Sequence, residues 1–192
     1  MDIDSYTIVI TGLGGQGLIR LIQILGNALV SEGYKVITSE THGLSQRGGK
    51  VTCFLRFGKE QQAPIPIVST TDMIIALELS CILDVIKYAK PDKSTNLVIS
   101  TYEKHEFETN YPPLEYILEI LYENSKNIHF IPVNEIAVKY SGNLKAMNIV
   151  ILGYVLRFLP IKTEAVKNTL KEYFSGFELE INLKAYIGGQ NL

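Results

Sequence analysis

The sequence predicts an α/β fold of three layers (α/β/α), with a mostly parallel, Rossmann-like sheet between two layers of helices. Short apolar strand-like segments alternate with segments of helical periodicity along the whole chain. The first strand, residues 6–11, is apolar and β-branched on both faces, as in a central parallel strand. It runs directly into a glycine turn and a helix, which is how a βαβ unit begins. A length of 192 residues fits one domain, so residues 1–192 are assigned to a single unit.

The first half of the chain supplies one helix and two further strands. Residues 18–31 form a helix whose few polar positions recur three or four residues apart, so most of its surface is buried. These positions are Arg20, Gln23, Asn27 and Ser31. Gly33 stands where a C-cap glycine belongs, and residues 35–39 read as the second strand. Residues 51–57 alternate with one more open face, which indicates a third strand at an edge of the sheet.

The second half continues the alternation. We predict strands at residues 73–77, 97–100 and 128–131, and helices at 80–89, 114–124, 146–158 and 163–174. Thr163 is the expected N-cap of the last of these helices, and Gly176 is its expected stop. A short helix at residues 182–187 would then end at Gly188 and Gly189.

Composition excludes several classes of protein. The net charge of -2 lacks the basic footprint of a nucleic-acid binder. The acidic N-terminus is no secretory signal, and no apolar run reaches the roughly 18 residues that a membrane helix needs. Cys53 and Cys81 form no Cys-x-x-Cys motif, so neither a disulfide framework nor a cysteine-ligated metal is expected, and a reducing cytoplasm fits best. His42, His105 and His129 lie far apart and show no metal-ligand spacing.

The glycine turn forms a G-x-G-x-x-G motif from Gly12, Gly14 and Gly17, in the strand–turn–helix context of a dinucleotide site. Backbone N–H groups at a helix start attract phosphates. Glu40, at the end of the second strand, lies where such folds carry their ribose-binding acid. One interpretation is therefore a stand-alone oxidoreductase that binds NAD or FAD. The other is that the glycines only let the helix pack closely on the sheet, and the motif alone does not separate the two.

A second glycine-rich loop follows the second strand and reads Thr-His-Gly-Leu-Ser-Gln-Arg-Gly-Gly over residues 41–49. The carboxyl ends of parallel strands meet at one edge of a sheet, so both loops should lie there. Arg47 offers a planar donor fork for a carboxylate or phosphate, although a solvated surface arginine would look the same. Asn143 and Asn148 could bind a ligand, but such residues more often cap helices or satisfy loop backbone.

Taken together, these loops resemble the gamma-type subunit of 2-oxoacid:ferredoxin oxidoreductases, which is also a domain of single-chain pyruvate:ferredoxin oxidoreductases. Residues 41–49 are most similar to the beta subunit of indolepyruvate:ferredoxin oxidoreductase. The resemblance covers nearly the whole chain. Its further matches are Leu25-Gly26-x-Ala28, Glu32-Gly33-Tyr34-x-Val36, Pro64 to Ile67, the run from Asp72 to Leu77 that ends in Glu78, Asn143 to Gly153 with its Asn148-x-x-x-x-Gly153 spacing, and Asn182 and Ala185 before Gly188.

The resemblance implies a subunit of a complex that oxidatively decarboxylates 2-oxoacids to acyl-CoA and reduces ferredoxin. It implies coenzyme A, thiamine diphosphate with magnesium, and [4Fe-4S] clusters in the complex, carried by a partner subunit. No cofactor is expected to bind tightly to this chain, which should be inactive alone. The sequence agrees, because it has neither four cysteines for a cluster nor a Gly-Asp-Gly stretch followed by paired asparagines for thiamine diphosphate. When isolated, the chain could self-associate through a surface that a partner would cover.

We expect the functional site to contain residues of both loops. Gly12, Gly14, Gly15, Gln16, Gly17 and Arg47 are the candidates for contact with coenzyme A phosphates or with the partner. His42, Gly43, Ser45, Gln46, Gly48 and Gly49 are the candidates for the interface. No residue is predicted to be catalytic or to bind a metal. A third reading, a regulatory module that reuses the fold, also stays open.

Overall fold

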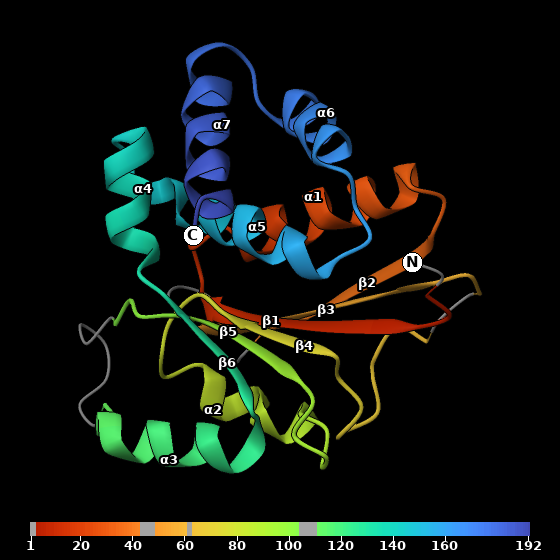
Figure 1. The fold of residues 1–192 in the computed structure, drawn as a ribbon, viewed down its shortest axis with the longest axis vertical. Coiled ribbons are helices and arrows are strands. Elements are labelled where there is room, and N and C mark those ends of the chain that lie inside the picture. The colour runs from red at the N-terminus through yellow and green to blue at the C-terminus, as the bar shows by residue number, and fades with distance from the viewer. Residues whose placement is uncertain (1–2, 43–48, 61–62, 104–110) are drawn as a thin grey trace.

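A computed structural model describes residues 3–42, 49–60, 63–103 and 111–192. Six strands form one sheet in the order β2-β3-β1-β4-β5-β6 (Figure 1). Their bounds are β1 Tyr6–Leu13, β2 Lys35–His42, β3 Lys50–Gly58, β4 Met73–Ala76, β5 Asn96–Ser100 and β6 Asn127–Ile131. The four strands from β1 to β6 in this order run parallel, and β3 runs antiparallel to both β1 and β2. The predicted mostly parallel sheet is confirmed.

The strand β3 lies inside the sheet, so the prediction that it forms an edge is wrong. Its Phe54 pairs with Val9 of β1 on one side and with Ser39 of β2 on the other. The strand at this edge of the sheet is β2, which pairs with β3 along its whole length and therefore runs on to His42 instead of ending at residue 39. One face of β3 is more open because fewer helices cover that side of the sheet, and not because β3 is an edge strand.

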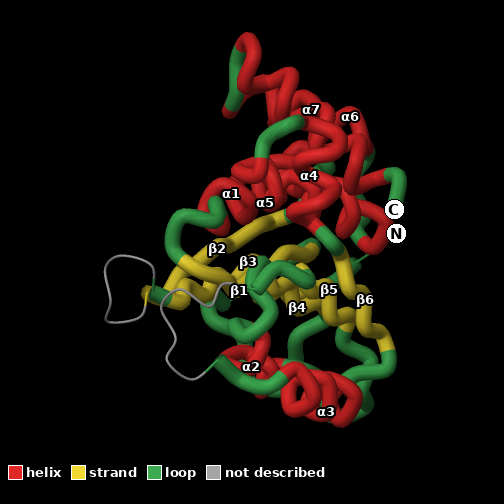
Figure 2. Tube along the Cα trace, turned by 90° about the vertical axis from the view of Figure 1, so that its left-hand side faces the viewer, coloured by secondary structure: helices red, strands yellow, loops and turns green. Residues whose placement is uncertain are grey.

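Helices cover the two faces of the sheet unequally (Figures 1 and 2). One face carries α1 Leu18–Ser31, α4 Val133–Ser141, α5 Met147–Val155, α6 Thr163–Tyr173 and α7 Gly176–Gln190. The other face carries α2 Ile82–Val85, the 3₁₀ helix Ile86–Tyr88 and α3 Leu114–Asn124. Alternate strand residues face the two layers, so that Ile8 and Ile10 join the larger core and Val9 joins the smaller one.

Several predicted helices change in length. The helix expected at residues 80–89 shrinks to α2 and its 3₁₀ extension, and α4 was not predicted at all. The helix expected at 146–158 is α5, with the 3₁₀ helices Leu144–Ala146 and Leu156–Phe158 at its ends. Although α5 is buried along its entire length, no described helix is both long and apolar enough to cross a membrane. For α6, the cap is Lys162, and Thr163 is already helical.

The glycines near the C-terminus do not act as helix stops. Gly176 begins α7, and Gly188 and Gly189 lie inside it. Residues 182–187 are helical as predicted, but the predicted bounds are wrong, because these residues form the middle of a longer helix. A Cβ on Gly189 would lie 1.9 Å from the carbonyl oxygen of Val150, and one on Gly153 would lie 2.1 Å from that of Tyr186. These glycines therefore let α5 and α7 cross at backbone contact, and this packing outweighs their low helix propensity.

Candidate functional site

The predicted glycine turn lies at the carboxyl edge of the sheet, between β1 and α1. Gly15 and Gly17 have φ angles of 92° and 79°, the left-handed region that favours glycine. Gly17 is also the N-cap residue of α1. The turn thus needs glycine at these positions for its backbone shape, whatever it binds.

The side chain of Gln16 folds back into this turn. Its Oε1 accepts a hydrogen bond from the backbone N–H of Leu13 at 2.7 Å, and its Nε2 donates to the carbonyl of Leu77 at 3.2 Å. A Cβ on Gly12 would lie 2.6 Å from the same Oε1, so that glycine makes room for the amide. Gln16 therefore joins the ends of β1 and β4. The helices that follow these two strands, α1 and α2, lie on opposite faces of the sheet.

Among the described residues, a backbone hydrogen bond joins the second loop to the first. The N–H of Gly14 donates to the carbonyl of Gly49 at 2.9 Å. At the other end of the loop, His42 ends β2 and pairs with Val51. Gly14 and Gly49 are thus adjacent, as the sequence predicts for the two loops. The other candidates on this loop, Gly43, Ser45, Gln46, Arg47 and Gly48, lie outside the described residues, as does the side chain of His42.

Asn148 secures the turn from a distant part of the chain. It lies in the first turn of α5, and its Nδ2 donates to the carbonyl of Gly17 at 3.1 Å. Asn143, by contrast, caps the 3₁₀ helix Leu144–Ala146 by accepting from the N–H of Lys145 at 3.0 Å. Of the two asparagines, only Asn148 reaches the candidate site.

A buried carboxylate, Glu78, follows β4 next to this turn and was missed as a site residue. Its Oε1 accepts from the hydroxyl of Tyr111 at 2.6 Å, and its Oε2 accepts from Ser80 at 2.7 Å. Burial opposes the charged form of Glu78, but the hydrogen bonds from Tyr111 and Ser80 outweigh it and lower its pKa. The available signal was a lone acidic residue at the end of an apolar strand, where α/β folds place ligand-binding groups.

The turn is a poor cradle for a dinucleotide. The N–H groups of Leu13, Gly14 and Gln16 are all used within the chain, which leaves those of Gly15 and Gly17 without a partner among the described residues. Because β3 separates β1 from β2, Glu40 stands two strands away from the turn, roughly 10 Å at the usual strand spacing. The ribose acid and the phosphate loop of the NAD or FAD interpretation are therefore not neighbours.

The cysteines have the surroundings of core residues. Both Cys53 and Cys81 are buried. Burial raises the pKa of the Cys53 thiol to about 11, and burial together with Glu78 raises that of Cys81. In the described part of the chain, no three His, Cys, Asp or Glu side chains gather as a metal site would require.

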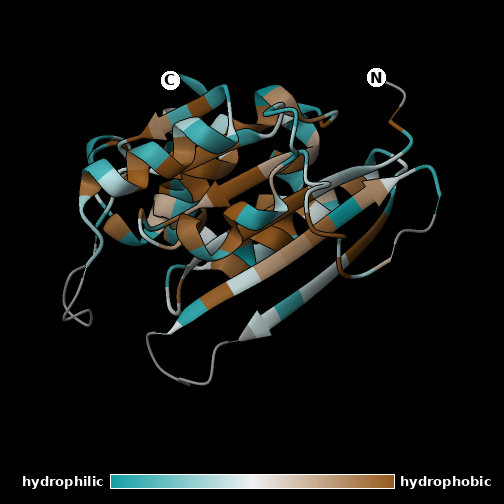
Figure 3. Ribbon diagram, turned by 90° about the horizontal axis from the view of Figure 1, so that it is seen from below, coloured by the Kyte–Doolittle hydropathy of each residue, from teal (hydrophilic) through white to brown (hydrophobic). Residues whose placement is uncertain are grey.

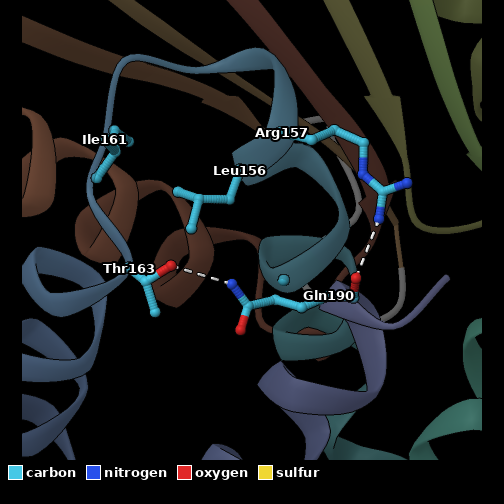
Figure 4. A pocket seen from close by; sticks show the side chains of 6 residues that line it. Leu156, Arg157, Ile161, Thr163 and Gln190 are labelled. Atoms are coloured by element: carbon cyan, nitrogen blue, oxygen red, sulfur yellow. Dashed lines mark hydrogen bonds between the residues drawn. The ribbon is translucent and has the colours of Figure 1, made fainter.

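A small cavity lies at the other end of α5, away from both loops (Figure 4). It has a volume of about 200 Å³ and is lined by Gly153, Leu156, Arg157, Ile161, Thr163 and Gln190. Gln190 donates to the hydroxyl of Thr163 at 3.2 Å, and Arg157 donates to the carbonyl of Gln190 at 3.4 Å. No described residue among the site candidates lines this cavity.

Comparison with known proteins identifies the family of the chain. The model of the family described as pyruvate ferredoxin/flavodoxin oxidoreductase matches residues 7–191. The chain belongs to this family. The resemblance inferred from the two loops is thereby confirmed.

Two kinds of relative within the family are similar over almost their full length. The chain is 34% identical over 194 residues to the indolepyruvate oxidoreductase subunit IorB of Archaeoglobus fulgidus, with 96% of this chain and 93% of that protein covered. It is 32% identical over 178 residues to the pyruvate/ketoisovalerate oxidoreductases common subunit gamma of Thermococcus kodakarensis, with 91% and 89% covered.

Solved structures share the fold at lower identity. The pyruvate oxidoreductase subunit PORC of Thermotoga maritima has a TM-score of 0.75 at 18% identity, with 98% of this chain and 96% of that chain covered. The 2-oxoglutarate:ferredoxin oxidoreductase of Magnetococcus marinus, solved with 2-oxoglutarate, coenzyme A and succinyl-CoA bound, has a TM-score of 0.75 at 21% identity. The match covers 98% of this chain but 31% of the Magnetococcus chain, so there the fold is part of a longer polypeptide.

Proposed function

We propose that this chain is an accessory subunit of a 2-oxoacid:ferredoxin oxidoreductase complex, with indolepyruvate as the candidate 2-oxoacid. The observation that carries the proposal is family membership across residues 7–191, together with relatives that are named as subunits of such oxidoreductases. The complex would convert a 2-oxoacid and coenzyme A into an acyl-CoA and carbon dioxide, and pass two electrons to ferredoxin.

The chemistry would take place on a partner subunit. Thiamine diphosphate with magnesium and the [4Fe-4S] clusters would be carried there, and ferredoxin would be reduced through the complex. The two separate, buried cysteines of this chain support that assignment, because a cubane cluster needs four thiolates. The role of this chain would be to complete the assembly and to shape the site on its partner.

The proposed contact with that partner is the carboxyl-edge corner, by which we mean the glycine turn of residues 12–17 together with the loop of residues 41–49. The hydrogen bond between Gly14 and Gly49 joins the two loops, and Gln16 and Asn148 fix the turn so that it needs no rearrangement on docking. The N–H groups of Gly15 and Gly17, at the start of α1, and the guanidinium of Arg47 would be the donors available to a coenzyme A phosphate.

Replacement of Arg47 by Ala tests this role. The variant should assemble less with the thiamine-bearing subunit, or the complex should need more coenzyme A for half-maximal rate, while the isolated chain keeps its melting temperature. Lys126→Ala, which removes an exposed positive charge just before β6 at the amino edge of the sheet, serves as the control for loss of a surface charge. If the Arg47 variant assembles and turns over like the wild type, the loop has no such role.

A further inference from the structure

The cavity at the other end of α5 lies between three helices (Figure 4). Gly153 of α5, Thr163 at the start of α6 and Gln190 at the end of α7 all line it. Gln190 is two residues from the C-terminus, which lies on the opposite side of the molecule from the end of β2 (Figures 2 and 3). The cavity is therefore remote from the carboxyl-edge corner, and a ligand there would be independent of the proposed function.

The lining of the cavity combines apolar and polar side chains. Leu156 and Ile161 are buried and supply the apolar part. The amide of Gln190 and the hydroxyl of Thr163 supply a polar part. The volume of about 200 Å³ is enough for a molecule of roughly half a dozen non-hydrogen atoms. Sites for small molecules commonly join an apolar surface to a few fixed polar groups in this way.

A buried hydroxyl next to the cavity lacks a hydrogen bond. Tyr186 of α7 is fully buried, and its hydroxyl has no hydrogen-bond partner among the described residues. Thr163 and Gln190 lie close enough to oppose the rise that burial causes in the pKa of Tyr186, yet neither bonds to it with ordinary geometry. Nearly all buried polar groups in proteins are paired with protein, water or a ligand. The hydroxyl therefore indicates a hydrogen-bonding molecule on this side of the cavity.

Arg157 is held at the cavity without a counter-ion. Its Cζ lies 4.0 Å from the centroid of the Tyr154 ring, and its Nε donates to the Tyr154 carbonyl at 3.0 Å. Its Nη2 donates to the carbonyl of Gln190 at 3.4 Å. Two of its five N–H groups are used in these bonds, and no carboxylate pairs with Arg157 in the described part of the chain. An arginine fixed by stacking can offer its remaining N–H groups to an oxyanion.

The start of α6 adds a positive partial charge to the same place. Lys162, its N-cap residue, makes no side-chain hydrogen bond to the helix end, and the N–H of Thr163 has no partner among the described residues. The opposite partial charge, at the end of α7, is met by Arg157 through the Gln190 carbonyl. The charges around the cavity therefore favour an anion.

We propose that this cavity binds a small monocarboxylate, of about the size of propionate or pyruvate. The carboxylate takes the remaining N–H groups of Arg157, and Tyr186 donates to the ligand oxygen nearest Thr163. The short carbon chain lies against Leu156 and Ile161. This apolar contact favours a carboxylate over inorganic phosphate, and the guanidinium favours the anion over a neutral amide of the same shape.

A titration of the purified full-length chain, followed by ¹H–¹⁵N NMR at constant ionic strength, tests the site. Sodium propionate should shift the amide signals of residues 153–163 and 186–190 and saturate in the millimolar range. Propionamide, which has the same shape but no charge, should bind at least about tenfold more weakly, and so should sodium phosphate.

Two variants separate binding from a structural role. Arg157→Gln should weaken propionate binding by about tenfold or more, because it removes the charge. Arg20→Gln is the matched control, since Arg20 also stacks on a tyrosine, Tyr173, but at the other end of α6, and it should bind as the wild type does. Tyr186→Phe should weaken binding by about threefold or more while raising the melting temperature of the free chain, because it removes an unpaired buried hydroxyl.

The proposal is overturned if the wild type does not bind propionate, if propionamide or phosphate binds as tightly, or if Arg157→Gln keeps the affinity of the wild type. Should Arg157→Gln fold poorly, Tyr186→Phe decides, and an unchanged propionate affinity of that variant contradicts the site. None of these results depends on assembly with a partner subunit, so the proposed function is tested separately.

Discussion

At the scale of single residues, Gln16 has the clearest structural role in the candidate site. It satisfies one backbone donor at the end of β1 and one backbone acceptor at the end of β4. A motif search weighs only the glycines around it, yet this amide determines how much of the turn is left open to a ligand. The identity of the residue between Gly15 and Gly17 is therefore informative about function.

Gln16→Ala should lower the free energy of unfolding by about 2 kcal/mol, because it leaves the Leu13 N–H and the Leu77 carbonyl without their partner. Urea unfolding followed by circular dichroism measures the change. Gln23→Ala, an exposed glutamine on α1, is the control and should stay within about 0.5 kcal/mol of the wild type. Equal stability of both variants would show that the Gln16 hydrogen bonds contribute nothing.

His129 gives the chain a pH dependence of stability. Its Nδ1 lies 3.0 Å from the hydroxyl of Tyr154, and its Nε2 is buried without a hydrogen bond to any described residue. Burial, helped by the charge of Arg157, lowers the pKa of His129 below its usual 6.5. The fold therefore favours the neutral ring, and its contribution is complete above pH 6.5 and is lost as the pH falls through the lowered folded-state pKa.

We expect the melting temperature of the wild type to fall more between pH 7.5 and pH 5 than that of His129→Gln, because glutamine takes up no proton. Differential scanning calorimetry across this range compares the two slopes. Parallel curves for the two proteins would contradict a role for His129 in the pH response.

At the scale of elements, the crossing of α5 and α7 carries the strictest steric requirement among the described glycine positions. Gly153 and Gly189 bring the two helix backbones together. The sequence predicts that the C-terminal helix ends at Gly188 and Gly189, and the crossing explains why α7 continues through them. It also anchors Asn148, at the start of α5, against the glycine turn.

Gly153→Ala should destabilise the chain by about 3 kcal/mol, or prevent folding, since its Cβ would lie 2.1 Å from the Tyr186 carbonyl oxygen. Gly26→Ala in α1 is the matched control. Its Cβ would meet Val36 Cγ1 at an ordinary 3.7 Å, so better helix propensity should make it neutral or stabilise it by up to about 1 kcal/mol. Denaturation midpoints of the two variants moving in the same direction would contradict the close-crossing argument.

At the scale of the whole molecule, the arrangement predicts a chain that lacks its own redox cofactor. The turn has few open donors, and Glu40 lies two strands from it. A thermal-shift assay on the purified chain distinguishes an accessory subunit without its own redox cofactor from an oxidoreductase that binds NAD or FAD. NAD and FAD should leave the melting temperature unchanged, whereas a true ligand at 100 times its Kd would add about 2.7 kcal/mol and raise it by about 5 °C or more.

The same purified chain should not oxidise 2-oxoacids, and activity should appear when the thiamine-bearing subunit is added. A ferredoxin-reduction assay with indolepyruvate and coenzyme A measures this. Turnover by the isolated chain with a bound nucleotide would contradict the proposed role as an accessory subunit.

Much of the fold could be predicted from the sequence because strand and helix periodicity is local. The helix α1 and the helix α3 begin and end as their apolar patterns indicate. The predictions were wrong where contacts between distant segments decide the structure. They placed β3 at an edge of the sheet, ended the last helix at its glycines, and did not include α4. For the site, the proximity of the two loops could be predicted, and Asn148 was a candidate. The contacts of Asn148 with Gly17 and of Glu78 with Tyr111 could not be predicted, since these partners lie on other elements.

By itself, the sequence determined the fold class, the family and the two glycine loops at one sheet edge, because these depend on residue types and spacings along the chain. Only the tertiary structure decided that β3 separates Glu40 from the turn, that Gln16 fills the turn, and that Ile65 and Ile67 are exposed to solvent. Strand order and side-chain exposure are set by packing between segments that are remote in sequence, and no local pattern records them.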